Sequence, residues 1–292
     1  MRPVGLVGIP SNSNGTTGGV AGAPAALREA GLVEVLERHV DLRDFGDLLL
    51  PEPTPERDVE THLINPGGVA RLVRLVRHAV GTILTEGRFP LVIGGDCPLL
   101  LGCLLAARAG ERIGLLFVDG HEDGYVPTQS STGEAADMEL AFALGIADLS
   151  WSPELSAVQP LVNTADVVIL GARDAETLRE EGVPSLGDRV LLVDGEALIR
   201  DPGSAAGTAC SSLPRPWWFH LDLDVLSTEA LPAIDYPQPG GLGWDELSLL
   251  VATALRAGPA GWDVTIYNPD LDPDRIHADR IIAFLAAAFG AA

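Results

Sequence analysis

The stretch Asp119-Gly-His121-Glu-Asp123 has the residue types and the spacing to hold a metal ion. It directly follows the apolar run 113–118, which predicts a buried strand. Alternate residues of an extended chain point to the same side, so carboxylate oxygens and an imidazole nitrogen can converge on one point. Such a mixture of ligands suits a divalent cation of intermediate hardness, such as Mn²⁺.

A second acidic stretch, Asp222-Leu-Asp224, repeats this arrangement after the apolar run 217–221. His220 lies two residues before Asp222 and is expected to face the same way, although a histidine that is hydrogen-bonded within a strand is an equally good interpretation. Each stretch alone is also compatible with a solvated turn. Together they favour a metal site, because two acidic groups at strand ends would otherwise repel each other.

The segments that must position these residues alternate between short apolar runs and amphipathic helical patterns. Strands are expected at 4–9, 40–43, 89–93, 113–118, 167–170, 190–193, 217–221 and 262–267, and helices at 24–38, 66–87, 98–108, 134–144, 175–181, 245–256 and 278–292. This alternation predicts an α/β fold in which helices cover both faces of a parallel sheet of about eight strands. Ligands of such sheets bind outside the carboxyl ends of the strands, where both acidic stretches lie.

The composition predicts one domain that spans residues 1–292. Hydrophobic residues make up 47% of the chain, which is enough to bury a large core. The 41 acidic residues outnumber the 19 basic ones and give a net charge of -22. This charge argues against nucleic acid and anionic membranes as partners and tolerates a cationic small-molecule substrate.

The cysteines and the apolar segments indicate in which cellular compartment the protein resides. The odd number of cysteines, at Cys97, Cys103 and Cys210, and the lack of a CxxC spacing argue against a disulfide framework. Arginines interrupt the most apolar helical segment, 69–84, so no membrane span is expected. The N-terminus shows no charged leader followed by an apolar stretch. We therefore expect a cytoplasmic protein.

Three motifs, taken in order, resemble the metal motifs of the arginase/agmatinase (ureohydrolase) superfamily. The family has GGDH, DAHxD and DxD where this chain has Gly94-Gly95-Asp96-Cys97, Asp119-Gly-His121-Glu-Asp123 and Asp222-Leu-Asp224. The resemblance extends from the N-terminal segment 18–32 through 171–174 to Asn268-Pro269, and so it covers nearly the whole chain.

The resemblance implies a three-layer arginase-like α/β fold and a cluster of two divalent metal ions, expected to be Mn²⁺. Carried over by position, the ligands of one ion are Cys97, Asp119, Asp123 and Asp222, and those of the other are Asp119, His121, Asp222 and Asp224. The family often forms trimers or hexamers. A homo-oligomer is therefore expected, although no sequence feature specifies an interface.

The implied reaction is hydrolysis of a non-peptide C–N bond. Two close cations lower the pKa of a shared water. The resulting hydroxide attacks the carbon of a guanidinium or amidine group, while Asp123 orients it and the metal pair stabilises the tetrahedral intermediate. Asp123 and the bridging Asp119 are therefore the expected catalytic residues.

Cys97 stands where most of the family has a metal-binding histidine. A thiolate is a softer ligand, which suits Zn²⁺ or Fe²⁺ better than Mn²⁺. The alternative is a small buried cysteine with no ligand role. At this position the chain is similar to the Nω-hydroxyarginine hydrolase branch of the superfamily, which favours a modified guanidine as substrate.

The positions that bind substrate in arginases also differ. By offset, Tyr125 and Thr132 take the places of an Asn and a Ser that bind the α-carboxylate, and Ala136 takes the place of a proton-shuttling His. Nearby, Glu134 and Asp137 could bind a cation or relay protons, or form the acidic first turn of a helix. These changes make arginine itself a less suitable substrate.

Ile266 is the largest departure, because the family has there a Glu that holds the guanidinium. An apolar side chain cannot pair with a planar cation. Either another acid, Glu176 or Asp263, takes over this contact, or the substrate is not a simple guanidinium.

We therefore predict a two-metal hydrolase that acts on a guanidino, hydroxyguanidino or related amidine compound and releases urea or hydroxyurea plus an amine. A formimidoylglutamate-type hydrolase is one alternative. It would need a basic residue for the substrate's carboxylates, and Arg173 is the candidate near a motif. A non-catalytic ureohydrolase-like binding protein is another alternative, motivated by Cys97, Ala136 and Ile266.

Overall fold

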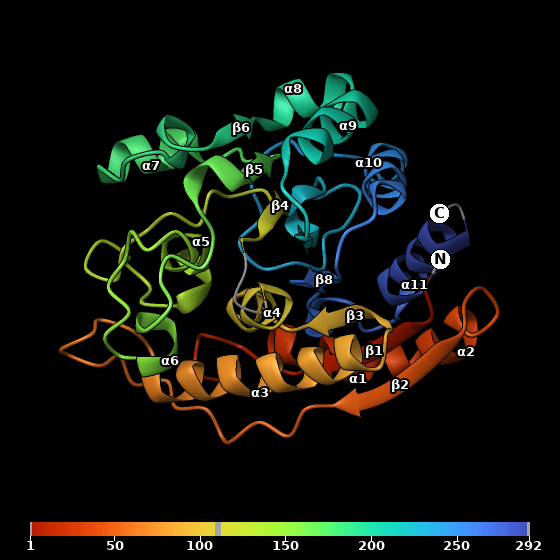
Figure 1. Cartoon of the computed structure of the whole chain (residues 1–292), viewed down its shortest axis with the longest axis horizontal. Coiled ribbons are helices and arrows are strands. Elements are labelled where there is room, and N and C mark those ends of the chain that lie inside the picture. The colour runs from red at the N-terminus through yellow and green to blue at the C-terminus, as the bar shows by residue number, and fades with distance from the viewer. Residues whose placement is uncertain (1, 109–111, 291–292) are drawn as a thin grey trace.

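A parallel sheet runs through the middle of the molecule in the computed structural model, which describes residues 2–108 and 112–290 (Figure 1). Its eight strands lie in the order β2-β1-β3-β8-β7-β4-β5-β6. The strands are β1 (Val4–Ile9), β2 (Leu42–Asp47), β3 (Phe89–Gly94), β4 (Gly114–Val118), β5 (Val167–Leu170), β6 (Leu191–Val193), β7 (Trp217–Asp222) and β8 (Trp262–Thr265). The expected parallel sheet is confirmed.

Helices cover both faces of the sheet and make the fold three-layered (Figure 1). The helices are α1 (Ala23–Glu29), α2 (Leu32–Leu36), α3 (Pro66–Thr85), α4 (Leu99–Arg108), α5 (Glu139–Ala143), α6 (Pro153–Ser156), α7 (Ala175–Glu181), α8 (Gly195–Arg200), α9 (Pro202–Ser212), α10 (Trp244–Ala257) and α11 (Ile276–Gly290). Buried side chains of α1, α2, α9, α10 and α11 form the core on one face, and those of α3, α4 and α5 form the core on the other. The predicted three-layer α/β architecture is therefore also confirmed.

Local sequence explains the start of α3 and the break between α1 and α2. Helix α3 begins at Pro66, whose missing N–H is harmless in a first turn, and the side chain of Asn65 accepts a hydrogen bond from the Gly68 N–H. The single helix expected over 24–38 is wrong, because Gly31 adopts a left-handed conformation with φ of 94° and separates α1 from α2. Glycine takes this conformation without the strain of a Cβ atom.

The helix expected over 134–144 is also interrupted. A 3-10 turn, η2 (Ala135–Asp137), precedes the short helix α5, and Met138 between them has φ of -147°. The backbone N–H of Ala141 donates to the carbonyl of Asp123 in the loop after β4. This tertiary contact ties the start of α5, and with it Glu139, to the loop that carries the first acidic stretch.

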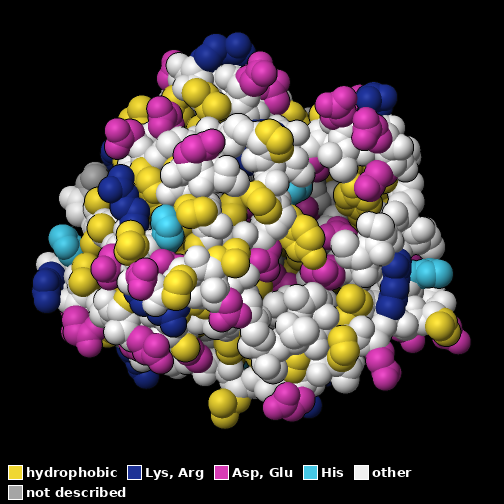
Figure 2. All heavy atoms as spheres, turned by 180° about the vertical axis from the view of Figure 1, so that it is seen from behind, with side chains coloured by type: hydrophobic (Ala, Val, Ile, Leu, Met, Phe, Trp, Pro, Cys, Tyr) yellow, Lys and Arg dark blue, Asp and Glu magenta, His cyan; other side chains and the backbone are white. Residues whose placement is uncertain are grey.

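Acidic side chains are spread over the face shown in Figure 2, and several line a hollow there. This distribution agrees with the net charge of -22. Among the described residues, no helix is both long enough and apolar enough to cross a membrane.

Candidate metal centre

The acidic stretches meet because their strands are neighbours at the centre of the sheet. Strands β3, β8, β7 and β4 are adjacent in that order, and the loops that follow parallel strands emerge at the same edge. The loop after β3 brings Cys97, the loop after β4 brings His121 and Asp123, and the end of β7 brings Asp222. Together they line a cavity of about 290 Å³.

One set of ligand atoms, here called group B, consists of Asp119, His121 and Asp224, whose ligand atoms lie within 4.8 Å of one another. His121 Nδ1 is 2.7 Å from Asp224 Oδ2 and 3.6 Å from Asp119 Oδ1. The N–H of Gly120 donates to Asp224 Oδ1, which holds the two acidic stretches together. Of the three alternate residues expected to converge, Asp119 and His121 belong to this group, whereas its third member is Asp224 and not Asp123.

A second set, here called group A, consists of Cys97, Asp119, Glu139 and His220, and its ligand atoms also lie within 4.8 Å of one another. Asp222, which the resemblance placed here, accepts a hydrogen bond of 2.9 Å from Cys97 Sγ. The sequence prediction did not include Glu139 among the ligands. The feature that could have revealed it is that Glu139 is the one acidic residue in the otherwise apolar segment 138–143, all of which is buried.

Several polar atoms of these groups are buried without a hydrogen-bond partner in the described part of the chain. They are Asp119 Oδ2, both carboxylate oxygens of Glu139, and His220 Nε2. Buried polar atoms are nearly always paired, because an unpaired one costs free energy. Oxygen and nitrogen atoms left free around one point are the donors that a divalent cation needs, so the residues fit a metal site.

The carboxyl groups of the site cannot all ionise in the absence of cations. Burial and the charge of Glu139 raise the pKa of Asp123 well above its ordinary value, and burial and the charge of Asp224 raise that of Asp222. Burial also raises the pKa of Asp119, but the neighbouring imidazoles of His121 and His220 outweigh it and lower that pKa overall. A dication would remove the repulsion among these groups.

The residues expected to bind substrate divide into those on the cavity wall and those away from it. Tyr125 and Thr132 line the cavity, where the Tyr125 hydroxyl donates to Glu181 at 2.6 Å and the Thr132 hydroxyl donates to Asp137. Glu134 lies behind the wall, and its carboxylate accepts a hydrogen bond of 2.7 Å from the hydroxyl of the lining residue Tyr236.

The structure does not bring either proposed replacement for the missing guanidinium-binding Glu into the cavity. The side chain of Glu176 on α7 is 82% exposed and lies near Arg179. Asp263 is buried beneath the site, where it is bonded to Trp218 and His220. Besides the acids of the two acidic stretches, the acids that line the cavity are Asp137, Asp174, Glu181 and Asp235. Sequence motifs did not point to Glu181 or Asp235, because both lie outside the motif loops.

Arg173 is occupied by backbone carbonyls. Its guanidinium donates to the carbonyl oxygens of Gly171, Asp224, Val225 and Pro239. No basic side chain other than His121 is among the described residues that line the cavity. The arginine thus braces the loop after β7 and leaves the cavity acidic.

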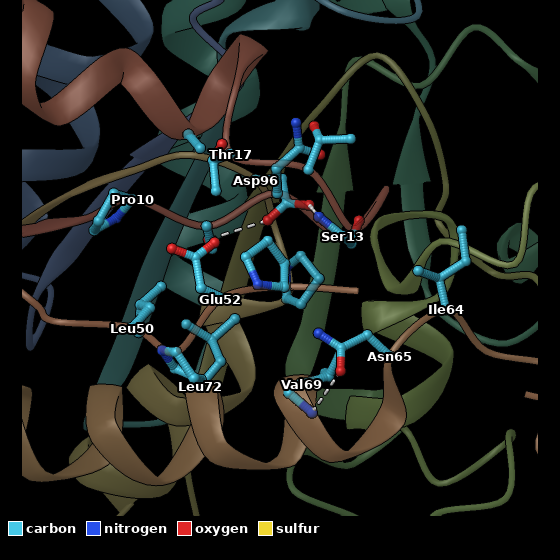
Figure 3. A pocket seen from close by; sticks show the side chains of 18 of the residues that line it. Pro10, Ser13, Thr17, Leu50, Glu52, Ile64, Asn65, Val69, Leu72 and Asp96 are labelled. Carbon is cyan, nitrogen blue, oxygen red and sulfur yellow. Dashed lines mark hydrogen bonds between the residues drawn. The ribbon is translucent and has the colours of Figure 1, made fainter. Parts of the chain in front are cut away.

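A second cavity of about 330 Å³ lies beside Asp96 and α3 (Figure 3). Its walls are largely apolar, with Leu72 and Val69 facing Asp96 across it in Figure 3. The Asp96 carboxylate already accepts hydrogen bonds from the Ser11 hydroxyl and the Ser13 N–H. Neither ligand group borders this cavity, so the chemistry belongs to the first one.

Comparison with known proteins gives the same family as the motifs. Arginase-1 of Sus scrofa is 29% identical over 306 residues, which cover 100% of this chain and 94% of that protein. The solved structure of the arginase from Bacillus caldovelox superimposes with a TM-score of 0.85 at 26% identity and covers 99% of both chains. The proclavaminate amidino hydrolase of Streptomyces clavuligerus shares the fold, with a TM-score of 0.69 at 20% identity over 100% of this chain and 91% of that one. The family model described as "Arginase family" matches residues 2–290. The chain therefore belongs to the arginase family, as its three motifs predicted.

Proposed function

We propose that the protein is a two-metal hydrolase that cleaves a C–N bond of a guanidino, hydroxyguanidino or related amidine compound and releases urea or hydroxyurea plus an amine. Members of the arginase family are metal-dependent hydrolases of C–N bonds in guanidino compounds. The observation that supports the proposal best is the convergence of two groups of ligand atoms on one cavity.

The proposed ions are two divalent cations, with Mn²⁺ at group B, where the ligands are imidazole and carboxylate. When bound, two close cations lower the pKa of a shared water and make hydroxide available near neutral pH. Asp119 belongs to both groups, so its two carboxylate oxygens would serve both ions. Cys97 belongs to group A, and Asp123 and Asp222 line the cavity beside it, where the family resemblance implies further ligands.

Asp123 is the proposed proton acceptor. Its side chain is buried at the cavity wall. A carboxylate at this place can orient the attacking water and accept its proton, once neighbouring cations keep it ionised. The backbone of Asp123 has a φ of 44°, an uncommon conformation outside glycine, and such conformations occur often at functional sites.

The cavity favours a substrate with a cationic or neutral tail. Tyr125 and Thr132 donate their hydroxyl hydrogens to Glu181 and Asp137, so neither hydroxyl is directed at a substrate carboxylate. Asp235 and Asp174 add further acidic groups to the wall. This arrangement attracts an amine or a second guanidinium and repels the α-carboxylate of arginine. We therefore propose a guanidine whose tail ends in an amine or an uncharged group.

A substrate screen with Mn²⁺, Zn²⁺ and Fe²⁺ tests this proposal. Urea, hydroxyurea and formamide should be measured together for guanidines that carry an amine, a neutral group or a carboxylate. We expect urea or hydroxyurea from the amine and neutral series, at higher kcat/KM than from arginine. If no compound is hydrolysed by protein that carries its metals, the chain is not a hydrolase of this class.

Two alternatives give different outcomes in the same screen. A formimidoylglutamate-type hydrolase would release formamide, but the backbone contacts of Arg173 leave it unsuited to bind substrate carboxylates. A non-catalytic binding protein is favoured by Ala136 and Ile266, which line the cavity where the family has a His and a Glu. It would bind guanidines without releasing any product.

We further propose that the chain works as a single ureohydrolase domain in the cytoplasm and forms a homo-oligomer. The three cysteines are buried and free of disulfides, which is typical of a reducing compartment. Family membership supports the oligomer. Light scattering of the purified protein and fractionation of the cells that produce it test these two points.

A further inference from the structure

Glu139 is a buried acid that lies close enough to Asp123 for each carboxyl to shift the pKa of the other. Its side chain is fully buried at the start of α5, and neither carboxylate oxygen accepts a hydrogen bond from a described residue. Apolar neighbours in the chain, Met138 and Leu140, are fully buried as well. A carboxylate in such surroundings needs a cation or a shared proton, and the side chain is directed towards Cys97, Asp119 and His220.

His220 is held as metal-binding histidines usually are. In the sheet it lies opposite Phe117 of β4 and Asp263 of β8. Its ring stacks on Phe117, with centroids 4.7 Å apart, and its Nδ1 lies 2.5 Å from Asp263 Oδ2. Trp218 Nε1 donates to the other oxygen of Asp263 and fixes that carboxylate. A carboxylate behind an imidazole orients the ring and leaves the second nitrogen for a metal. That nitrogen, Nε2, has no hydrogen-bond partner among the described residues.

The distances among these atoms are close to those of a tetrahedral zinc site. His220 Nε2 is 3.7 Å from Asp119 Oδ2. Bonds of about 2.0–2.3 Å to zinc place neighbouring ligand atoms roughly 3.3 to 3.7 Å apart. All four ligand atoms of group A lie within 4.8 Å of one another, so small side-chain rotations bring the remaining atoms to this spacing.

We propose that group A, formed by Cys97, Asp119, Glu139 and His220, is a zinc-selective site that differs in its ligands from the site that the motifs alone imply. One thiolate, one imidazole and two carboxylates form the ligand mixture that zinc accepts, and sulfur disfavours Mn²⁺. Group B has no sulfur and keeps Mn²⁺, so the protein holds two different metals. Zinc binding releases the proton of the Cys97 thiol to solvent. The inference rests on the proposed metal-dependent function, but hydrolysis is not needed to test it.

Spectroscopy of the unaltered protein is the first test. Protein loaded with Co²⁺ in place of Zn²⁺ should show a near-ultraviolet thiolate-to-cobalt charge-transfer band, and zinc X-ray absorption should show one sulfur neighbour at about 2.3 Å. Cys97→Ala should abolish the cobalt band. Cys103→Ala is the matched control, because Cys103 is also a buried free cysteine but belongs to neither ligand group, and it should keep the band. Protein that binds two metal ions without a sulfur neighbour would overturn the proposal.

Metal content of two further variants tests Glu139 and His220. Glu139→Gln and His220→Asn should each lower zinc affinity by about tenfold or more and leave one Mn²⁺ per chain, measured by equilibrium dialysis and elemental analysis. His121→Asn should lower Mn²⁺ affinity and leave zinc bound, because it removes a ligand of group B only. Unchanged zinc affinity in both Glu139→Gln and His220→Asn would show that these residues are not ligands.

Hydrolysis measured on the same samples separates this inference from the proposed function. A zinc–sulfur signal without any hydrolysis would contradict the proposed function but support the zinc site. Hydrolysis by protein that has no zinc–sulfur signal would contradict the zinc site but support the proposed function.

Discussion

Asp119 is the residue on which both ligand groups depend. Its carboxylate lies 3.6 Å from His121 Nδ1 on one side and 3.7 Å from His220 Nε2 on the other. We therefore predict that Asp119→Ala removes both metal ions, as measured by elemental analysis after dialysis, because each ion loses a charged ligand. His121→Asn should lose only the ion of group B. A fully loaded Asp119→Ala variant would show that the two groups do not share this ligand.

The carboxyl group of Glu134 titrates near neutral pH in the folded protein. Burial raises its pKa to about 7, compared with about 4.3 in an unfolded chain. Between these values the folded protein keeps a proton that the unfolded chain has lost. The contribution to the free energy of unfolding is therefore fully present below about pH 4 and falls as pH rises towards 7, by on the order of 3 kcal/mol.

In the variant Glu134→Gln, this decrease in the free energy of unfolding with rising pH should be absent. Its amide oxygen can still accept the hydrogen bond from Tyr236, so the structure around it is kept. Urea unfolding of both proteins from pH 4 to pH 8, with metals at saturation, measures the difference. Parallel curves for the two proteins would mean that Glu134 does not titrate in this range.

At the scale of elements, the turn after β3 positions Cys97 by packing directly on the segment after β1. The N–H of Gly95 donates to the Ile9 carbonyl, and the Gly95 carbonyl accepts from the N–H of Ile266. A Cβ atom built on Gly95 would lie 1.8 Å from the Ser11 carbonyl oxygen. A contact this short with backbone cannot be relieved by a side-chain rotation, so the turn itself would have to move.

We therefore predict that Gly95→Ala lowers the free energy of unfolding by about 2 kcal/mol or more and weakens metal binding at Cys97. Gly81→Ala is the matched control. Gly81 lies within α3, and nothing is within 4 Å of its added Cβ, so this change should stabilise the helix by about 0.5–1 kcal/mol. Urea unfolding measures both variants. Equal stability for the two would contradict the role assigned to the turn.

At the scale of the whole molecule, the buried acids make the fold depend on its metals. The carboxyls of Asp119, Asp123, Glu139, Asp222 and Asp224 are all buried in one site. We predict that Mn²⁺ and Zn²⁺ at 100 times their Kd values stabilise the protein by about 2.7 kcal/mol per ion, which is roughly 4 °C in Tm per ion for a chain of this length. Differential scanning calorimetry with and without a chelator measures the shift. Asp119→Ala should show almost no shift, since it binds neither ion.

Much of the architecture was predictable because it rests on local patterns. Continuous apolar runs gave the central strands to within a few residues, since strands buried on both faces have this composition. The edge strand β2 is mostly polar, and the expected strand 40–43 overlaps it only at its start. The breaks in the helices were not predictable in the same way. Gly31 interrupts one helix through a left-handed conformation, and the contact between Ala141 and Asp123 interrupts another. The spacing of apolar residues within a helix does not predict a hydrogen bond to a distant loop.

The sequence by itself determined the parallel α/β sheet and the family and predicted a metal site at the strand ends, because these depend on patterns within segments and on the order of the motifs along the chain. Only the tertiary structure decided which side chains share that site. Glu139 and His220 reach Cys97 through strand order and through the tie between α5 and the loop after β4. Likewise, Glu176 points away, whereas Glu181 from the same helix lines the cavity. Which side chains share a site depends on contacts between distant segments, and the spacing of residues along one segment does not predict those contacts.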